Sequence, residues 1–148
     1  MRNPRLLMVA LAALLVLVVA ACGSAANDYR GEVAEVQKGH LDTIKAQETA
    51  LEAAVQSGDA EAATASLATV SEAWTKLADE VDALEAPKET QALADTIVAS
   101  YRGLATAADE MQAAWADGDS EAAMASWEAY AAAGKAADAA VEQLNKVD

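Results

Sequence analysis

Residues 66–84 read SLATVSEAWTKLADEVDAL, and the spacing of apolar residues in this stretch decides the fold. The larger apolar side chains recur every three or four residues: Leu67, Val70, Trp74, Leu77, Val81 and Leu84. Because an α-helix turns by about 100° per residue, side chains at this spacing lie on one face. The stretch therefore predicts an amphipathic helix whose apolar stripe packs against other helices.

Three further stretches show the same periodicity, so that helices are expected over about residues 29–56, 60–85, 88–116 and 120–146. The breaks between them are Ser57-Gly58-Asp59, Ala86-Pro87-Lys88 and Asp117-Gly118-Asp119. In the first and third breaks the glycine suits the left-handed residue that ends a helix, and the aspartate after it suits an N-cap. Four helices of this length with short connections predict an all-α, up-down-up-down four-helix bundle.

The composition and the net charge exclude several classes of binding partner and site. The chain has 148 residues, no Phe and a formal charge of -14, and after residue 21 it contains 24 Asp and Glu against eight Lys and Arg. Nucleic acid is excluded as a partner on this basis, and the bundle surface is not expected to bind anionic lipid headgroups. The single cysteine, Cys22, allows neither an intramolecular disulfide nor a cysteine metal site.

The first 21 residues have the three parts of a secretion signal. Arg2 and Arg5 supply a basic start, residues 6–20 are wholly apolar, and Val19-Ala20-Ala21 precede Cys22. The apolar part is shorter than the roughly 20 residues that a membrane-spanning helix needs. This pattern predicts a cleaved signal peptide. Cys22 is either part of the signal or an incidental cysteine that follows an ordinary signal peptide.

The four residues Val19 to Cys22 resemble the lipobox of bacterial lipoproteins. That resemblance implies a diacylglycerol thioether on Cys22, cleavage before it, and a protein anchored on the extracytoplasmic face of the cell membrane. The expected division is a signal peptide at 1–21, an acylated Cys22 with a flexible tether at 22–28, and the bundle at 29–148. The alanine-rich, Asp-rich composition resembles actinobacterial proteins.

Two short segments 60 residues apart are alike: SGDAEAATAS at 57–66 and DGDSEAAMAS at 117–126. A duplicated hairpin explains the match, and chance similarity in an alanine-rich bundle explains it equally well. The central segment LADEVDALEAPKETQALADTI, residues 77–97, resembles small actinobacterial lipoproteins to which no function is assigned.

One group of side chains is a candidate site. On a helical wheel His40 and Asp138 fall on the apolar faces of the first and fourth helices, and their heights place both in one layer with Tyr101. The first and fourth helices are expected to be neighbours, so a His-Asp pair across their interface is a hypothesis. This layer is either a polar layer that fixes helix register or a ligand or proton-sensing site.

The sequence contains none of the motifs that would indicate catalysis. It has no Glu-x-x-His pair, phosphate-binding loop or nucleophile elbow, and His40 lies roughly 16 Å along the bundle axis from Met111 and Met124, too far to share a haem iron. We therefore predict a monomeric, non-enzymatic module without a cofactor, which binds another envelope protein or a small ligand. The alternative is a bundle that carries a metal or cofactor on His40 and nearby carboxylates.

Overall fold

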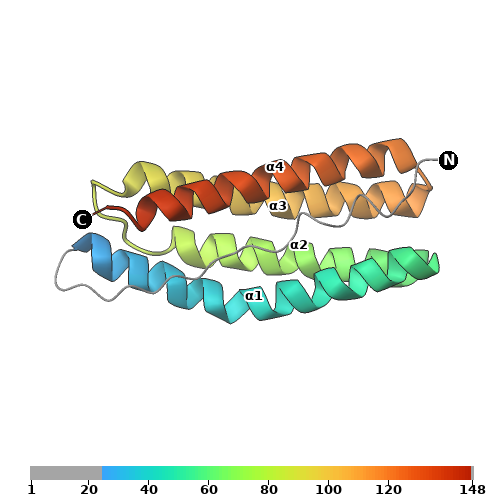
Figure 1. Ribbon diagram of the computed structural model, residues 1–148, viewed down its shortest axis with the longest axis horizontal. Helices are drawn as coiled ribbons and strands as arrows, with labels where there is room; N and C mark the ends of the chain where they lie inside the picture. Colours follow the sequence, from blue (N-terminus) through green and yellow to red (C-terminus); the bar gives the residue numbers. More distant parts are fainter. Residues whose placement is uncertain (1–24, 148) are drawn as a thin grey trace.

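The computed structural model describes residues 25–147. Its four helices are α1 (Ala25–Ser57), α2 (Ala60–Asp82), α3 (Gln91–Asp117) and α4 (Ser120–Leu144), and residues 25–147 contain no strand. The helices run antiparallel to their neighbours along one long axis (Figure 1). The predicted all-α four-helix bundle is confirmed. The predicted signal peptide, Cys22 and residues 23–24 lie outside the described residues.

The two Gly-Asp turns have the backbone geometry that the sequence predicts. Gly58 and Gly118 adopt φ angles of 73° and 70°, in the left-handed region that glycine enters without steric cost. The Asp59 carboxylate accepts a hydrogen bond from the Ala62 amide at 3.0 Å, and the Asp119 carboxylate does the same for Ala122 at 3.0 Å. Each aspartate therefore satisfies a backbone donor that the first turn of a helix leaves unpaired.

α1 begins at Ala25, four residues before the predicted start, so residues 25–28 are helical and are not part of a flexible tether. The added turn is held by packing, because Ala26 is fully buried and Tyr29 is almost fully buried. The Arg30 guanidinium also donates a hydrogen bond to the Val147 carbonyl, which ties the beginning of α1 to the residues after α4.

The connection between α2 and α3 is longer than predicted, because α2 ends at Asp82 and α3 begins at Gln91. Thr90 precedes α3, but its hydroxyl does not cap the helix and instead donates to the Pro87 carbonyl at 3.1 Å. Since proline disfavours helical backbone in the residue before it, the chain cannot continue α2 through this segment.

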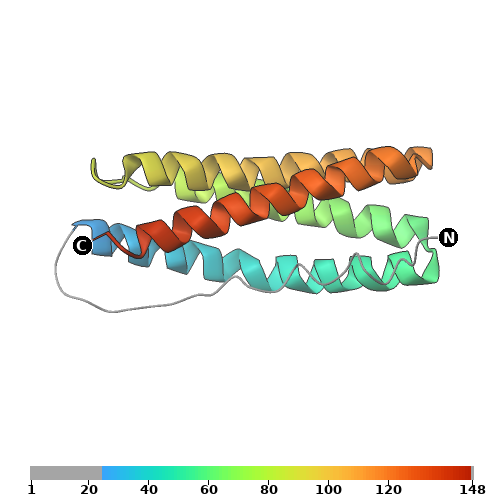
Figure 2. The same ribbon diagram turned by 45° about the horizontal axis from the view of Figure 1, so that its top comes forward.

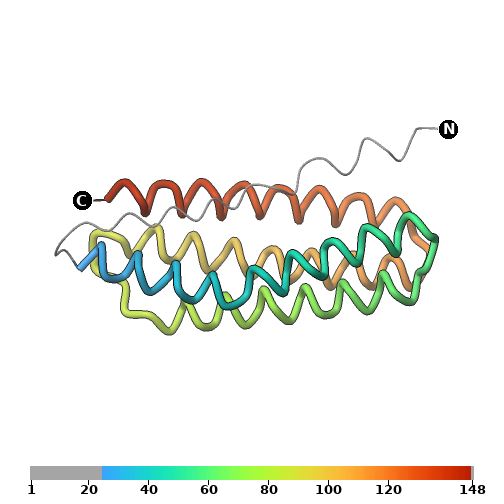
Figure 3. The backbone as a smooth tube through the Cα atoms, turned by 60° about the horizontal axis from the view of Figure 1, so that its bottom comes forward, coloured from blue at the N-terminus to red at the C-terminus, as the bar shows by residue number. Residues whose placement is uncertain are grey.

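We call the end of the bundle with the two Gly-Asp turns, residues 57–59 and 117–119, the turn end. The opposite end, where α1 begins, α4 ends and residues 83–90 connect α2 to α3, is the terminal end (Figure 3). Extensive helix packing joins α1 to α2, α2 to α3 and α3 to α4. Figures 1 and 2 show α4 lying beside the start of α1 at the terminal end and separating from α1 toward the turn end.

The core runs along the whole axis and combines many alanines with a few large side chains. The largest fully buried ones include Tyr29, Tyr101, Ile44, Leu67, Leu77, Ile97 and Leu104. Leu67, Val70, Trp74, Leu77 and Val81 of the predicted stripe on α2 are all buried. Among residues 25–147, no helix is long and apolar enough to cross a membrane.

Candidate functional site

The three residues predicted to share one layer do not form a single group. Tyr101 is fully buried in α3. The His40 imidazole is half-buried on α1, with its Nε2 atom 3.1 Å from a carboxylate oxygen of Glu80 on α2. Asp138 is exposed on α4, where partial desolvation of its carboxyl raises the pKa. Among residues 25–147 the predicted His40–Asp138 ion pair is not formed, because the His40 imidazole lies beside Glu80 on α2 instead.

Gln37 occupies the position in the core that the sequence analysis gave to His40. Its side chain is 4% exposed, and its amide donates a hydrogen bond to the Tyr101 hydroxyl. Burial raises the pKa of Tyr101 to about 12, and the negative charge of Asp138 acts in the same direction. Tyr101 therefore remains a neutral phenol at physiological pH, held between α1 and α3.

A second hydrogen-bonded chain crosses the bundle between α2, α4 and α1. The indole N–H of Trp74 donates to the Tyr130 hydroxyl at 2.7 Å, and this hydroxyl donates to a carboxylate oxygen of Glu48 at 2.8 Å. Trp74 and Tyr130 are both buried, and Glu48 is half-buried. These two hydrogen bonds link α1 to α4, although the backbones of the two helices do not pack closely.

The Gln37–Tyr101 hydrogen bond and the hydrogen bonds from Trp74 through Tyr130 to Glu48 are connected by an aromatic contact. The rings of Trp74 and Tyr101 have centroids 5.4 Å apart and are tilted by 31°, within the range of favourable aromatic pairs. A continuous network therefore runs from Gln37 through Tyr101, Trp74 and Tyr130 to Glu48, with every helix contributing at least one side chain. We call these five residues the polar network.

The electrostatics of the polar network follow from burial. Desolvation raises the pKa of Glu48, and the hydrogen bond from Tyr130 lowers it by a smaller amount. Desolvation, with the nearby charge of Glu48, raises the pKa of Tyr130 well above its ordinary value. The network contains no nucleophile activated by a base, and its hydrogen bonds are directed between helices. Hydrogen bonds of this kind between buried side chains can fix the register of neighbouring helices.

Replacing Glu48 with glutamine tests the cost of the half-buried charge. Because the folded pKa of Glu48 is raised, ionisation opposes folding: this penalty is absent below the ordinary value of 4.5 and grows as pH rises through the folded value. Glutamine keeps a carbonyl acceptor for Tyr130 without the charge. Glu48→Gln is therefore expected to be more stable than the parent protein at neutral pH, and this difference should disappear near about pH 4.

Chemical denaturation across this pH range measures the effect. The control is Glu52→Gln, one turn further along α1, where the exposed carboxylate accepts a hydrogen bond from Gln56 at 3.1 Å. This variant reports the loss of one negative charge from an acidic surface. If Glu48→Gln and Glu52→Gln show the same pH dependence, the charge of Glu48 has no special cost in the folded protein.

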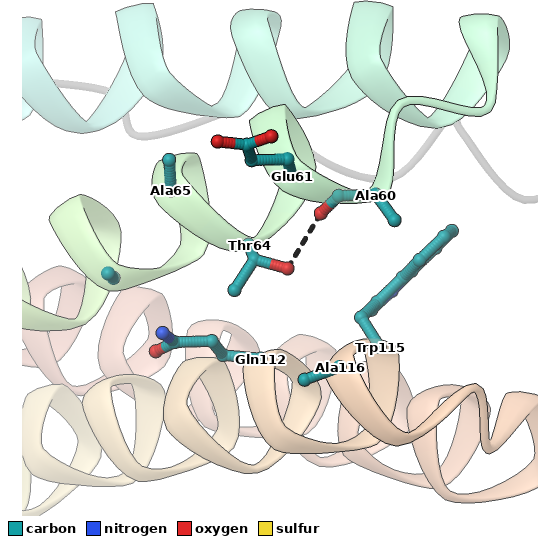
Figure 4. A pocket seen from close by; sticks show the side chains of 8 residues that line it. Ala60, Glu61, Thr64, Ala65, Gln112, Trp115 and Ala116 are labelled. Atoms are coloured by element: carbon teal, nitrogen blue, oxygen red, sulfur yellow. Dashed lines mark hydrogen bonds between the residues drawn. The ribbon is translucent and has the colours of Figure 1, made fainter.

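A separate surface feature lies between α2 and α3 at the turn end. It is an open groove of about 420 Å³, lined on α2 by Ala60, Glu61, Thr64, Ala65 and Ala68. On α3 the lining residues include Gln112 and Trp115, and the Trp115 side chain extends along the groove toward the start of α2 (Figure 4). We call this feature the α2/α3 groove. Small side chains on α2 leave it open beside one large aromatic ring.

Within residues 25–147, no three His, Cys, Asp or Glu side chains are grouped so that they could hold a metal ion. His40 has one carboxylate beside it, that of Glu80. No protein-family model, curated protein or solved structure matches the chain.

Both ends of the polar network and the α2/α3 groove were not predicted from the sequence. Gln37 and Glu48 were overlooked because they are polar, although they continue the spacing of Val33, Leu41 and Ile44 on α1. A polar side chain in the middle of an apolar stripe is the signal that could have identified both. The groove has no comparable signal, since exposed alanines occur on every helix.

Proposed function

We propose that the protein is a lipid-anchored, non-enzymatic binding module on the extracytoplasmic face of the cell membrane. The observation that carries this proposal is the sequence Val19-Ala20-Ala21-Cys22, which follows a basic start and an apolar stretch. The basic start and the apolar stretch are those of a secretion signal, and the last four residues resemble the lipobox, which directs lipid attachment to cysteine.

The start of α1 supports this arrangement, because Ala25 is the third residue after Cys22. An anchor on Cys22 therefore holds the terminal end of the bundle beside the membrane. α1 has 33 residues, and at 1.5 Å per residue the turn end lies about 50 Å further out. The α2/α3 groove is then presented away from the lipid surface, and it supports a binding role.

Replacing Cys22 with serine tests the anchor. The expected result is complete loss of lipid attachment, because a hydroxyl does not replace the thiol as the acceptor, together with accumulation of the uncleaved precursor. Metabolic labelling with a fatty-acid analogue and the apparent mass of the protein measure both effects. Ser24→Ala is the matched control and should be labelled and processed normally. A Cys22→Ser protein that still takes up label contradicts the proposal.

A further inference from the structure

Charge is distributed unevenly along the bundle. Residues 46–75 and 103–134, which form the half of the bundle at the turn end, contain eleven Asp and Glu and no Lys or Arg. All eight Lys and Arg after the signal peptide lie in the half at the terminal end. The turn end is therefore a region of strongly negative potential, whereas in the terminal half eight Lys and Arg partly compensate 13 Asp and Glu.

Ion pairs reinforce this division. Arg102 lies 2.8 Å from Asp82 and 3.4 Å from Asp79, so its charge is neutralised by carboxylates of the terminal half. Lys76 pairs with Glu72 at the boundary, 2.7 Å away. Within the turn half, Glu72 has this cation beside it, and the other ten carboxylates have no Lys or Arg in their own half. A cationic partner would meet little competition from the protein's own basic side chains.

The α2/α3 groove lies within this negative region. Its floor is mainly alanine, Trp115 supplies a half-buried aromatic surface, and Glu61 places a carboxylate at its margin. Two antiparallel helices with small side chains between them form the kind of groove in which a third helix packs with its apolar side chains inward. The α2/α3 groove thus combines an apolar surface with negative charge at its margin.

We propose that the α2/α3 groove binds a cationic amphipathic helix of a partner protein, with its apolar face against Trp115 and the alanines of α2. A second copy of this chain does not fit, because it would bring two strongly negative turn ends together. An anionic lipid surface is repelled for the same reason. This inference deepens the proposed binding function and names the chemistry of its partner.

The test uses the full chain, purified in a neutral detergent, and a labelled synthetic peptide of about 18 residues with leucine at helical spacing and lysine elsewhere. Fluorescence anisotropy is expected to show saturable binding that weakens as salt is raised. A peptide with glutamate in place of lysine should not bind. Each variant is measured in the same micelles, so that peptide held by detergent contributes equally.

Two pairs of variants locate the binding site. Ala65→Leu fills the groove without changing charge and should weaken binding at least about tenfold, whereas Ala99→Leu, at an exposed alanine of α3 outside the groove, should not. Glu61→Gln should weaken binding about two- to threefold, and Glu89→Gln, at the terminal end, should have no effect.

Three results would overturn the proposal: no saturable binding of the lysine peptide, equal binding of the glutamate peptide, or equal affinity of Ala65→Leu and Ala99→Leu. Circular dichroism confirms that each variant is folded before binding is measured. The outcome is independent of the anchor. Failure of the Cys22 experiment leaves peptide binding unchanged, and failure of peptide binding leaves lipid labelling unchanged.

Discussion

Replacing Tyr130 with phenylalanine is expected to lower the free energy of unfolding by about 2–4 kcal/mol, because one hydroxyl makes two hydrogen bonds between helices. Without it, the Trp74 indole N–H is left buried and unpaired. Glu48 loses the donor that partly compensates its half-buried charge. Urea denaturation followed by circular dichroism measures the change.

Tyr29→Phe is the matched control for this prediction. Tyr29 is 2% exposed, and within residues 25–147 its hydroxyl has no hydrogen-bond partner. Removing this hydroxyl therefore breaks no hydrogen bond between helices, and stability should change by less than about 0.5 kcal/mol. If Tyr130→Phe and Tyr29→Phe change the free energy of unfolding equally little, the hydrogen bonds of Tyr130 to Trp74 and Glu48 do not stabilise the bundle.

Replacing Tyr101 with alanine is expected to have the largest effect of any single substitution considered, a loss of about 3–5 kcal/mol. Tyr101 is fully buried and contacts Trp74, so truncation leaves a cavity at the centre of the polar network. Tyr101→Phe keeps the ring and should cost about 1–3 kcal/mol, because the Gln37 amide then remains buried without an acceptor.

A double variant separates the hydrogen bond from the packing of the ring. In Gln37→Leu/Tyr101→Phe both polar partners are replaced by apolar groups, so no unpaired donor remains. We expect it to be more stable than Tyr101→Phe alone, with a positive coupling in the double-mutant cycle. A double variant that is less stable than either single variant would show that Gln37 and Tyr101 stabilise the protein independently.

The sequence predicted the parts of the fold that depend on neighbouring residues. Gly58 and Gly118 end helices in the left-handed conformation, and Asp59 and Asp119 cap the next ones, because turn and capping chemistry acts over a few residues. The buried face of α2 also followed directly from the spacing that includes Trp74 and Leu77. These features need no knowledge of how the helices are arranged.

The predicted site was wrong where it depended on the rotation of α1 and on contact between α1 and α4. Ile44 is buried as the helical wheel predicts, but between Val33 and Ile44 the buried positions are Gln37 and Leu41, and His40 is only half-buried. Because neighbouring residues lie about 100° apart around a helix, burial of Gln37 and Leu41 leaves His40 at the edge of the buried face, with its side chain 18% exposed. The packing of all the large side chains determines which residues of α1 face the core, and no local pattern in the sequence specifies this.

The order of helix packing has a consequence for how the chain folds. Each extensive helix interface joins two helices that follow one another in the sequence, and α1 and α4 are linked mainly by side chains. Contacts are therefore local in the chain, and proteins with low contact order fold quickly, within microseconds to milliseconds. The hairpin of α1 and α2 can form before α4 has been synthesised. The α3–α4 interface and the hydrogen bonds of Tyr130 form once the last helix is available.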